Sequence, residues 1–159
     1  MSSSQNKNTD GQFVNFTGYE SLPHNIEAEQ AILGAILIDE QNRCFDEVST
    51  ILGKEHFYDP MHGRIFEAAE RMISKDQLAT PITLNSYFQN DEGLNQLGGA
   101  KYLARLASSA ISTHDIKSYA QIILDLYIRR NLINIGKHIT HEASNVGAQD
   151  ISTTDQIEK

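Results

Sequence analysis

The sequence predicts an all-α fold: a compact helical head followed by a long helix or a helical hairpin. Three observations lead to this prediction. Apolar residues recur every three or four positions in one segment after another. No segment alternates apolar and polar residues long enough to predict a strand. Start signals typical of helices, at Asn25, Asp59-Pro60 and Thr80-Pro81, each precede such a pattern. We therefore expect one globular domain with its own core in these 159 residues.

Composition and charge exclude several classes of protein. The single cysteine, Cys44, excludes a disulfide framework and a cysteine-based zinc site, and it favours a reducing, cytoplasmic setting. The longest apolar run, Ala31–Ile38, is interrupted by Gly34 and is too short to cross a membrane. The net charge of −8 argues against a dedicated nucleic-acid-binding domain. The charge is polarised, however, because residues 25–92 carry −8 and residues 93–137 carry +4.

The predicted organisation begins with a polar, flexible leader over residues 1–21 and a helical head over residues 22–110. The first head helix, Ile26–Ile38, is apolar around most of its circumference, so we expect it at the centre. A short second helix carries Phe45 to Leu52 and ends at Gly53. The third begins at Pro60 and carries an apolar stripe as far as Ile73.

The rest of the head contains two further predicted helices. The first follows Thr80-Pro81, and its expected buried face is Leu84, Tyr87 and Phe88. Residues 91–99 are rich in turn formers, and Gly98-Gly99 is predicted to be a hinge. A helix with Tyr102, Leu103, Leu106, Ala107 and Ala110 completes the head.

Residues 111–146 are predicted to form the first helix of the hairpin region, periodic from about Asp115 to Ser144. Tyr119, Ile122, Leu126 and Ile133 define one apolar face, and Ile128, Leu132, Ile135 and Ile139 define another. One core cannot bury both faces. Either the helix bends near Asn131 and Asn134 and folds back, or the second face contacts another chain. Residues 147–159 are predicted to be a turn and the truncated start of the next helix or a linker.

Catalytic, cofactor and metal sites are not predicted from the residues of this chain. The segment Gly93–Gly98 resembles a phosphate-binding loop in its glycine spacing, but Gly99 stands where the essential lysine is needed. His138 and His141 lack a third ligand at helical spacing. The residues alone therefore predict an interaction or oligomerisation module.

Several sequence blocks, in the same order, resemble the N-terminal domain of bacterial replicative DNA helicases of the DnaB type. The blocks are LPHNIEAEQAILGAIL (22–37), HFY (56–58), HGRIF (62–66), PITL (81–84), GGAKYL (98–103), YAQII (119–123) and RRNLI (129–133). The resemblance covers about residues 22–145. It departs from the family pattern at His56, where an acidic residue is common, and in Pro81-Ile82-Thr83, which lacks an intervening acid.

The resemblance implies a collar domain that pairs subunits, as a dimer or as a trimer of dimers in a hexamer, and that docks the helicase-binding domain of primase. It also implies that the motor, with its ATP, magnesium and DNA sites, would follow Lys159, so that this chain alone would not be an enzyme. A helicase loader is a further implied partner. The implied location is the cytoplasm, at nucleoid-associated replication forks, with no contact with a membrane.

Six residues are singled out as contact candidates. Ile133 and Ile139 are expected at the hairpin contact, and Tyr102 and Glu27 near the primase-facing surface. For Tyr102 and Ile139 the alternative is that they fill the local core. Arg129 and Arg130 are weak candidates for contacting phosphate. They belong to a second hypothesis, in which the helical module guides single-stranded DNA.

Overall fold

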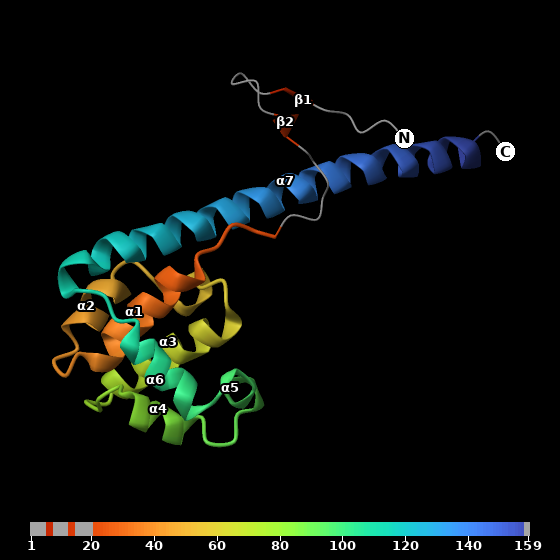
Figure 1. The fold of residues 1–159 in the computed structure, drawn as a ribbon. Helices are drawn as coiled ribbons and strands as arrows, with labels where there is room; N and C mark the ends of the chain where they lie inside the picture. The colour runs from red at the N-terminus through yellow and green to blue at the C-terminus, as the bar shows by residue number, and fades with distance from the viewer. Residues whose placement is uncertain (1–5, 8–12, 15–20, 158–159) are drawn as a thin grey trace.

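The computed structural model describes the backbone of residues 6–7, 13–14 and 21–157 and the side chains of residues 21–145. Helices dominate these residues (Figure 1), which confirms the all-α class. The α-helices are α1 (Ile26–Ile38), α2 (Arg43–Ser49), α3 (Pro60–Ile73), α4 (Pro81–Tyr87), α5 (Glu92–Leu97), α6 (Ala100–Ser108) and α7 (Ile116–Ile157). Two 3-10 helices, η1 (Lys54–His56) and η2 (Thr113–Asp115), lie in connections.

Two short strands precede the helices. β1 (Asn6–Lys7) and β2 (Phe13–Val14) pair in antiparallel register, with Asn6 opposite Val14. The flexible leader predicted for residues 1–21 otherwise lies outside the described residues, so its flexibility stays a prediction.

Helix starts are defined by local side-chain caps. Asn25 accepts a hydrogen bond from the N–H of Ala28 at 2.9 Å, and Asp59 accepts one from the N–H of Met61 at 2.8 Å. Thr80 forms a reciprocal capping box with Thr83. Pro60 and Pro81 occupy first helical positions, where the missing N–H costs no hydrogen bond. The three predicted helix starts are confirmed.

Helix α1 lies at the centre of the head, in contact with α2, α3, α6 and α7. Seven apolar side chains of α1 between Ala28 and Leu37 are at most 6% exposed. Gly34 permits the close approach of α6, because a Cβ atom there would lie only 2.0 Å from the carbonyl oxygen of Leu106. The packing therefore confirms the central position predicted for the first helix.

Two expectations for the head are wrong. The segment expected to be turn-rich contains α5, which Asp91 caps through a 3.0 Å hydrogen bond from the N–H of Leu94. Tyr87 is 49% exposed, although it was expected on the buried face of α4. Gly98 and Gly99 form the sharp connection into α6, with φ values of 119° and 59° that favour glycine.

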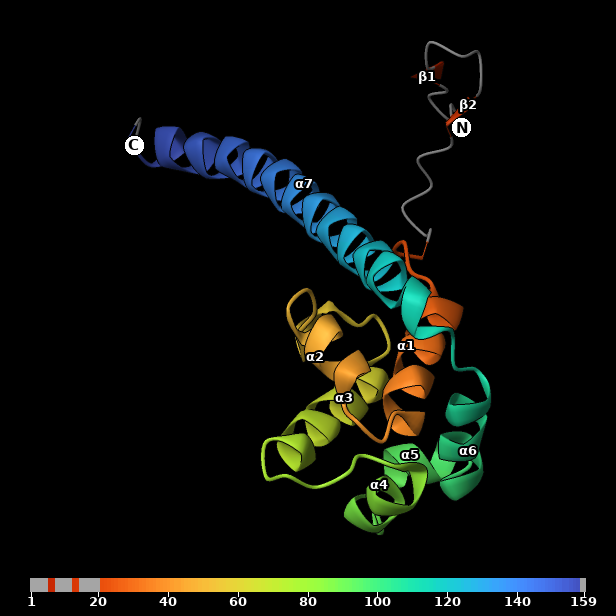
Figure 2. The same cartoon turned by 90° about the vertical axis from the view of Figure 1, so that its left-hand side faces the viewer.

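Helix α7 is continuous and projects beyond the head (Figure 2). It neither breaks at Asn131 and Asn134 nor turns at residues 147–150, so both the fold-back alternative and the predicted turn are wrong. The last proline in the sequence is Pro81, and a single helical glycine such as Gly147 costs only about 1 kcal/mol. The described helices include none that is long and apolar enough to span a membrane.

Candidate interaction surface and the polar network of the head

An apolar stripe runs along the exposed side of α7. It consists of Ile128, Leu132, Ile135 and Ile139, whose exposed fractions are 46%, 62%, 55% and 62%. Successive members are four, three and four residues apart, the spacing by which a helix presents one seam to a partner helix. We call these four residues the α7 stripe. Four large aliphatic side chains in a row on an exposed helix are typical of an interface.

The other side of α7 packs on the head. Ile116, Ala120 and Ile123 are at most 2% exposed and belong to the core. After Arg130, every described side chain of the helix, from Asn131 to Asn145, is exposed. The two predicted hairpin contacts are thus on the surface: Ile139 lies in the α7 stripe, and Ile133, 38% exposed, lies outside it, on the other apolar face of the helix.

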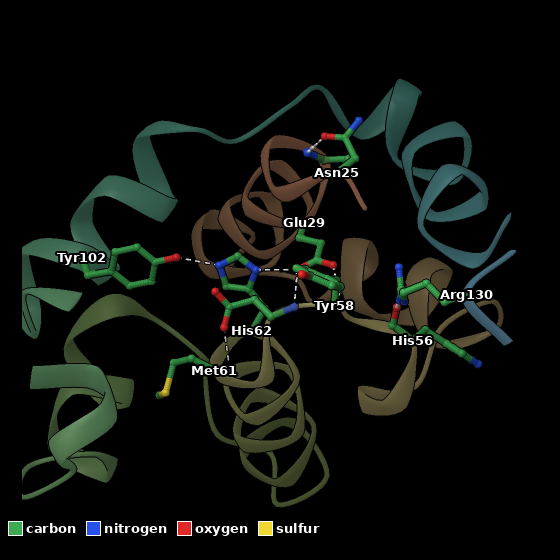
Figure 3. A network of polar contacts seen from close by, with 10 residues as sticks. Asn25, Glu29, His56, Tyr58, Met61, His62, Tyr102 and Arg130 are labelled. Atoms are coloured by element: carbon green, nitrogen blue, oxygen red, sulfur yellow. Dashed lines mark hydrogen bonds and ion pairs between the residues drawn. The ribbon is translucent and has the colours of Figure 1, made fainter. Parts of the chain in front are cut away.

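A hydrogen-bonded network crosses the interior of the head (Figure 3). His62 on α3 is fully buried, with Nδ1 2.6 Å from the carboxylate of Glu29 on α1 and Nε2 2.6 Å from the hydroxyl of Tyr102 on α6. Tyr102 is only 5% exposed, so its predicted place at the surface is wrong and its core alternative is right. Side chains from three helices therefore meet through one imidazole.

The geometry fits one consistent sharing of protons. With the Glu29 carboxyl oxygen as acceptor, Nδ1 of His62 donates to it, and in that neutral tautomer Nε2 accepts the Tyr102 hydroxyl proton. Burial raises the pKa of Tyr102, which keeps this hydroxyl protonated as a donor. The second Glu29 oxygen accepts the N–H of Tyr58 at 2.6 Å. We call Glu29, His62 and Tyr102 the core triad.

Arg130 occupies a second polar site, where α7 leaves the head. Its guanidinium donates to the carbonyl oxygens of Pro23 at 2.9 Å and His56 at 2.8 Å. It also lies over the rings of Tyr58 and Tyr127, 5.5 and 5.9 Å from their centroids. At 8% exposure it is not free to contact phosphate, so that expectation is wrong for Arg130. Arg129 is exposed, as a phosphate contact requires.

Cys44 is not a reactive group in this structure. Its side chain is 2% exposed, and burial, followed by the contact with Asp39, raises the pKa of the thiol to about 11. Burial would also raise the pKa of Asp39, but hydrogen bonds from the N–H groups of Cys44 and Gln41 outweigh it and lower that pKa. The hydrogen bond from the N–H of Cys44 to the Asp39 carboxylate thus spans the connection between α1 and α2.

Sequence reasoning found some of these residues and missed others. Glu27 is exposed, in agreement with its expected place at a surface. Glu29 and His62 were not recognised as a pair. The available signal was an acidic residue at a position that the apolar pattern of the first helix buries, since a buried carboxylate needs a partner. Nothing local in the sequence identifies that partner as His62.

The structure defines a helical domain with an exposed apolar stripe on its long helix, and comparison with known proteins identifies its family. The family model described as "DnaB-like helicase N terminal domain" matches residues 21–125. The replicative DNA helicase DnaB of Rickettsia felis is 42% identical over 86% of this chain, and that of Haemophilus influenzae is 31% identical over 81%. The chain belongs to the DnaB-like helicase N-terminal domain family. It spans 27% of the length of each of these two relatives.

Solved structures agree with this assignment. The N-terminal domain of the DnaB helicase from Mycobacterium tuberculosis superposes with a TM-score of 0.71, covering 78% of this chain and 88% of that one at 24% identity, which shows the fold. A DnaB-like replicative helicase, described together with its interactions with primase, has a TM-score of 0.59 at 30% identity. It covers 76% of this chain and 28% of its own. The helical fold of this chain is therefore shared with known members of the family.

Proposed function

We propose that this chain is the collar domain of a replicative DNA helicase, which pairs subunits in a hexamer and docks primase. In this proposal the α7 stripe contacts a second copy of the chain, and the head carries the primase-facing surface. ATP and magnesium would serve the motor part of such a helicase rather than this domain. Its place of action would be the cytoplasm, at the replication fork.

The observation that carries the pairing proposal is the exposure of the α7 stripe. Burying about four leucine or isoleucine side chains stabilises an interface by about 1.5–3 kcal/mol each, before the cost of association. The stripe faces away from the core residues of the same helix, so one helix can pack on the head and on a partner at once. A continuous helix also offers the stripe without any rearrangement of the head.

Light scattering coupled to size exclusion, over a concentration series, tests the pairing. We expect the wild type to form a dimer or a larger species, and Leu132→Asp to shift the protein to a monomer, because it places a charge in the middle of the stripe. The matched control is Asn134→Asp, which adds the same charge at an exposed position outside the stripe. A wild type that stays monomeric at all concentrations would contradict pairing through this helix.

Primase docking is supported by relatives of known structure. The N-terminal domain of DnaB helicase from Helicobacter pylori, with a TM-score of 0.64, is described with its interactions with primase, as is the DnaB-like helicase above. The test is a calorimetric titration of this chain with the helicase-binding domain of primase. We expect saturable binding that Glu27→Lys weakens, since Glu27 is exposed at the start of α1.

Guidance of single-stranded DNA is the alternative function. Of the two arginines that this function would use, Arg130 is not available, because its guanidinium donates hydrogen bonds to carbonyl oxygens. Fluorescence anisotropy with a labelled oligonucleotide distinguishes the two functions. Binding that falls steeply with salt and is weakened by Arg129→Ala would favour DNA guidance, and the absence of binding would favour the collar.

A further inference from the structure

Tyr58 lies between the core triad and the Arg130 site and contacts both. The backbone N–H of Tyr58 donates to Glu29, and the ring of the same residue supports the guanidinium of Arg130 from one side. Figure 3 shows the hydrogen bonds from Tyr102 through His62 and Glu29 to Tyr58, and the guanidinium of Arg130 lies over the Tyr58 ring. A path of direct contacts therefore connects the buried side chain of Tyr102 on α6 with Arg130 on α7.

Arg130 is the last buried side chain of α7 among those described. Its two hydrogen bonds reach the chain just before α1 and the end of η1, so one side chain connects α7 to two other segments. His24 stacks on the outer face of Tyr58, with centroids 4.1 Å apart, and His56 contacts Tyr127 edge-on at 4.6 Å. The exposed part of α7 begins directly after this site.

We propose that the core triad and the Arg130 site act as one conformational device, in which the triad positions Tyr58 and thereby determines the angle at which α7 leaves the head. The triad holds the Tyr58 backbone through the buried Glu29 carboxyl group, which accepts the Tyr58 N–H at 2.6 Å. The guanidinium of Arg130 contacts the Tyr58 ring, so the position of Tyr58 determines the position of Arg130. A change in the packing of α6 would then alter the orientation of the exposed helix without any contact between α6 and that part of α7.

Distance distributions between two spin labels test this coupling in the full chain. One label is placed at Asn85→Cys on α4 and the other at Ser144→Cys on α7, both exposed positions. Cys44 stays unlabelled, because it is buried and its thiol has a raised pKa. The labelled protein is diluted with an excess of unlabelled protein, so that only distances within one chain contribute.

We expect the distance distribution of the labelled wild-type background to have a single narrow peak. We expect Arg130→Lys to lose this peak, because lysine keeps the charge but cannot span both carbonyl oxygens. The decisive variant is Tyr102→Phe, which removes one hydroxyl far from α7 and is expected to broaden the same peak. Glu29→Gln is a second triad variant that keeps the side-chain shape, with the same expectation. Arg129→Lys and Tyr119→Phe are matched controls and are expected to leave the peak narrow.

The proposal is overturned if both triad variants, with wild-type circular dichroism, keep the narrow peak. Such a result would mean that the triad stabilises the head without affecting α7. A narrow peak in Arg130→Lys would equally overturn it, because α7 would then be held by its apolar contacts alone. The result needs no assumption about pairing or primase, since it concerns the geometry within a single chain.

Discussion

At the scale of single residues, the environment of Tyr102 decides its role. Its hydroxyl hydrogen-bonds to a buried histidine, so its contribution is to the interior of the head. The sequence identified Tyr102 as important but placed it at the surface. Its partner lies 40 positions away along the chain, and the next partner of that histidine lies 33 away. Periodicity predicts that a residue is buried, but it does not predict which distant polar groups will meet.

Tyr102→Phe should destabilise the head by about 1–3 kcal/mol, because His62 Nε2 is left buried without a partner. Urea unfolding followed by circular dichroism measures the change. Tyr119→Phe is the control: the Tyr119 hydroxyl makes no hydrogen bond within the described part of the chain, so the change should stay within about 0.5 kcal/mol. Equal effects of the two substitutions would contradict the role given to the triad.

The Cys44 thiol should resist modification in the folded protein. Its pKa is raised from 9.0 to about 11, so the folded state favours the protonated thiol. This contribution to stability is complete below pH 9 and is lost as the pH rises towards 11. We expect a thiol-specific reagent at pH 8 to react only when urea unfolds the chain. Rapid reaction under native conditions would show that Cys44 is accessible.

At the scale of helices, local sequence signals and long-range packing contribute separately to where each helix forms. The starts of α1, α3 and α4 follow from caps within a few residues, and they were predictable for that reason. Helix α5 was missed because its glycine and asparagine residues are typical of turns, while its stability depends on Leu94 in the core. The end of α7 was missed because Gly147 resembles a turn signal, although the helix continues through it.

Two glycines on different helices should respond in opposite ways to the same substitution. Gly34→Ala should destabilise the head by about 3 kcal/mol, at the upper end for overpacking, because the added Cβ meets the carbonyl oxygen of Leu106. Gly136→Ala meets no atom within 4 Å and should stabilise α7 locally by about 0.5–1 kcal/mol. Thermal unfolding measures the first change and helical circular dichroism the second. A neutral Gly34→Ala would contradict the close contact between α1 and α6.

At the scale of the whole molecule, the head and α7 use their apolar residues differently. The head buries most of its apolar residues in one core, whereas α7 buries one side and exposes the α7 stripe. The sequence predicted both apolar faces, but it left open whether the second would fold back or stay exposed. That choice depends on the helix remaining continuous past Asn131 and Asn134, which no local signal determines.

The central claim is that the α7 stripe contacts a second copy of the chain, and hydrogen exchange as a function of protein concentration tests it most directly. Amides of residues 128–139 in the wild type should become more protected as the concentration rises, while those of α1 should not change. In Leu132→Asp the protection of this segment should stay low at every concentration, and in Asn134→Asp it should follow the wild type. Exchange of residues 128–139 that is independent of concentration in the wild type would contradict the claim.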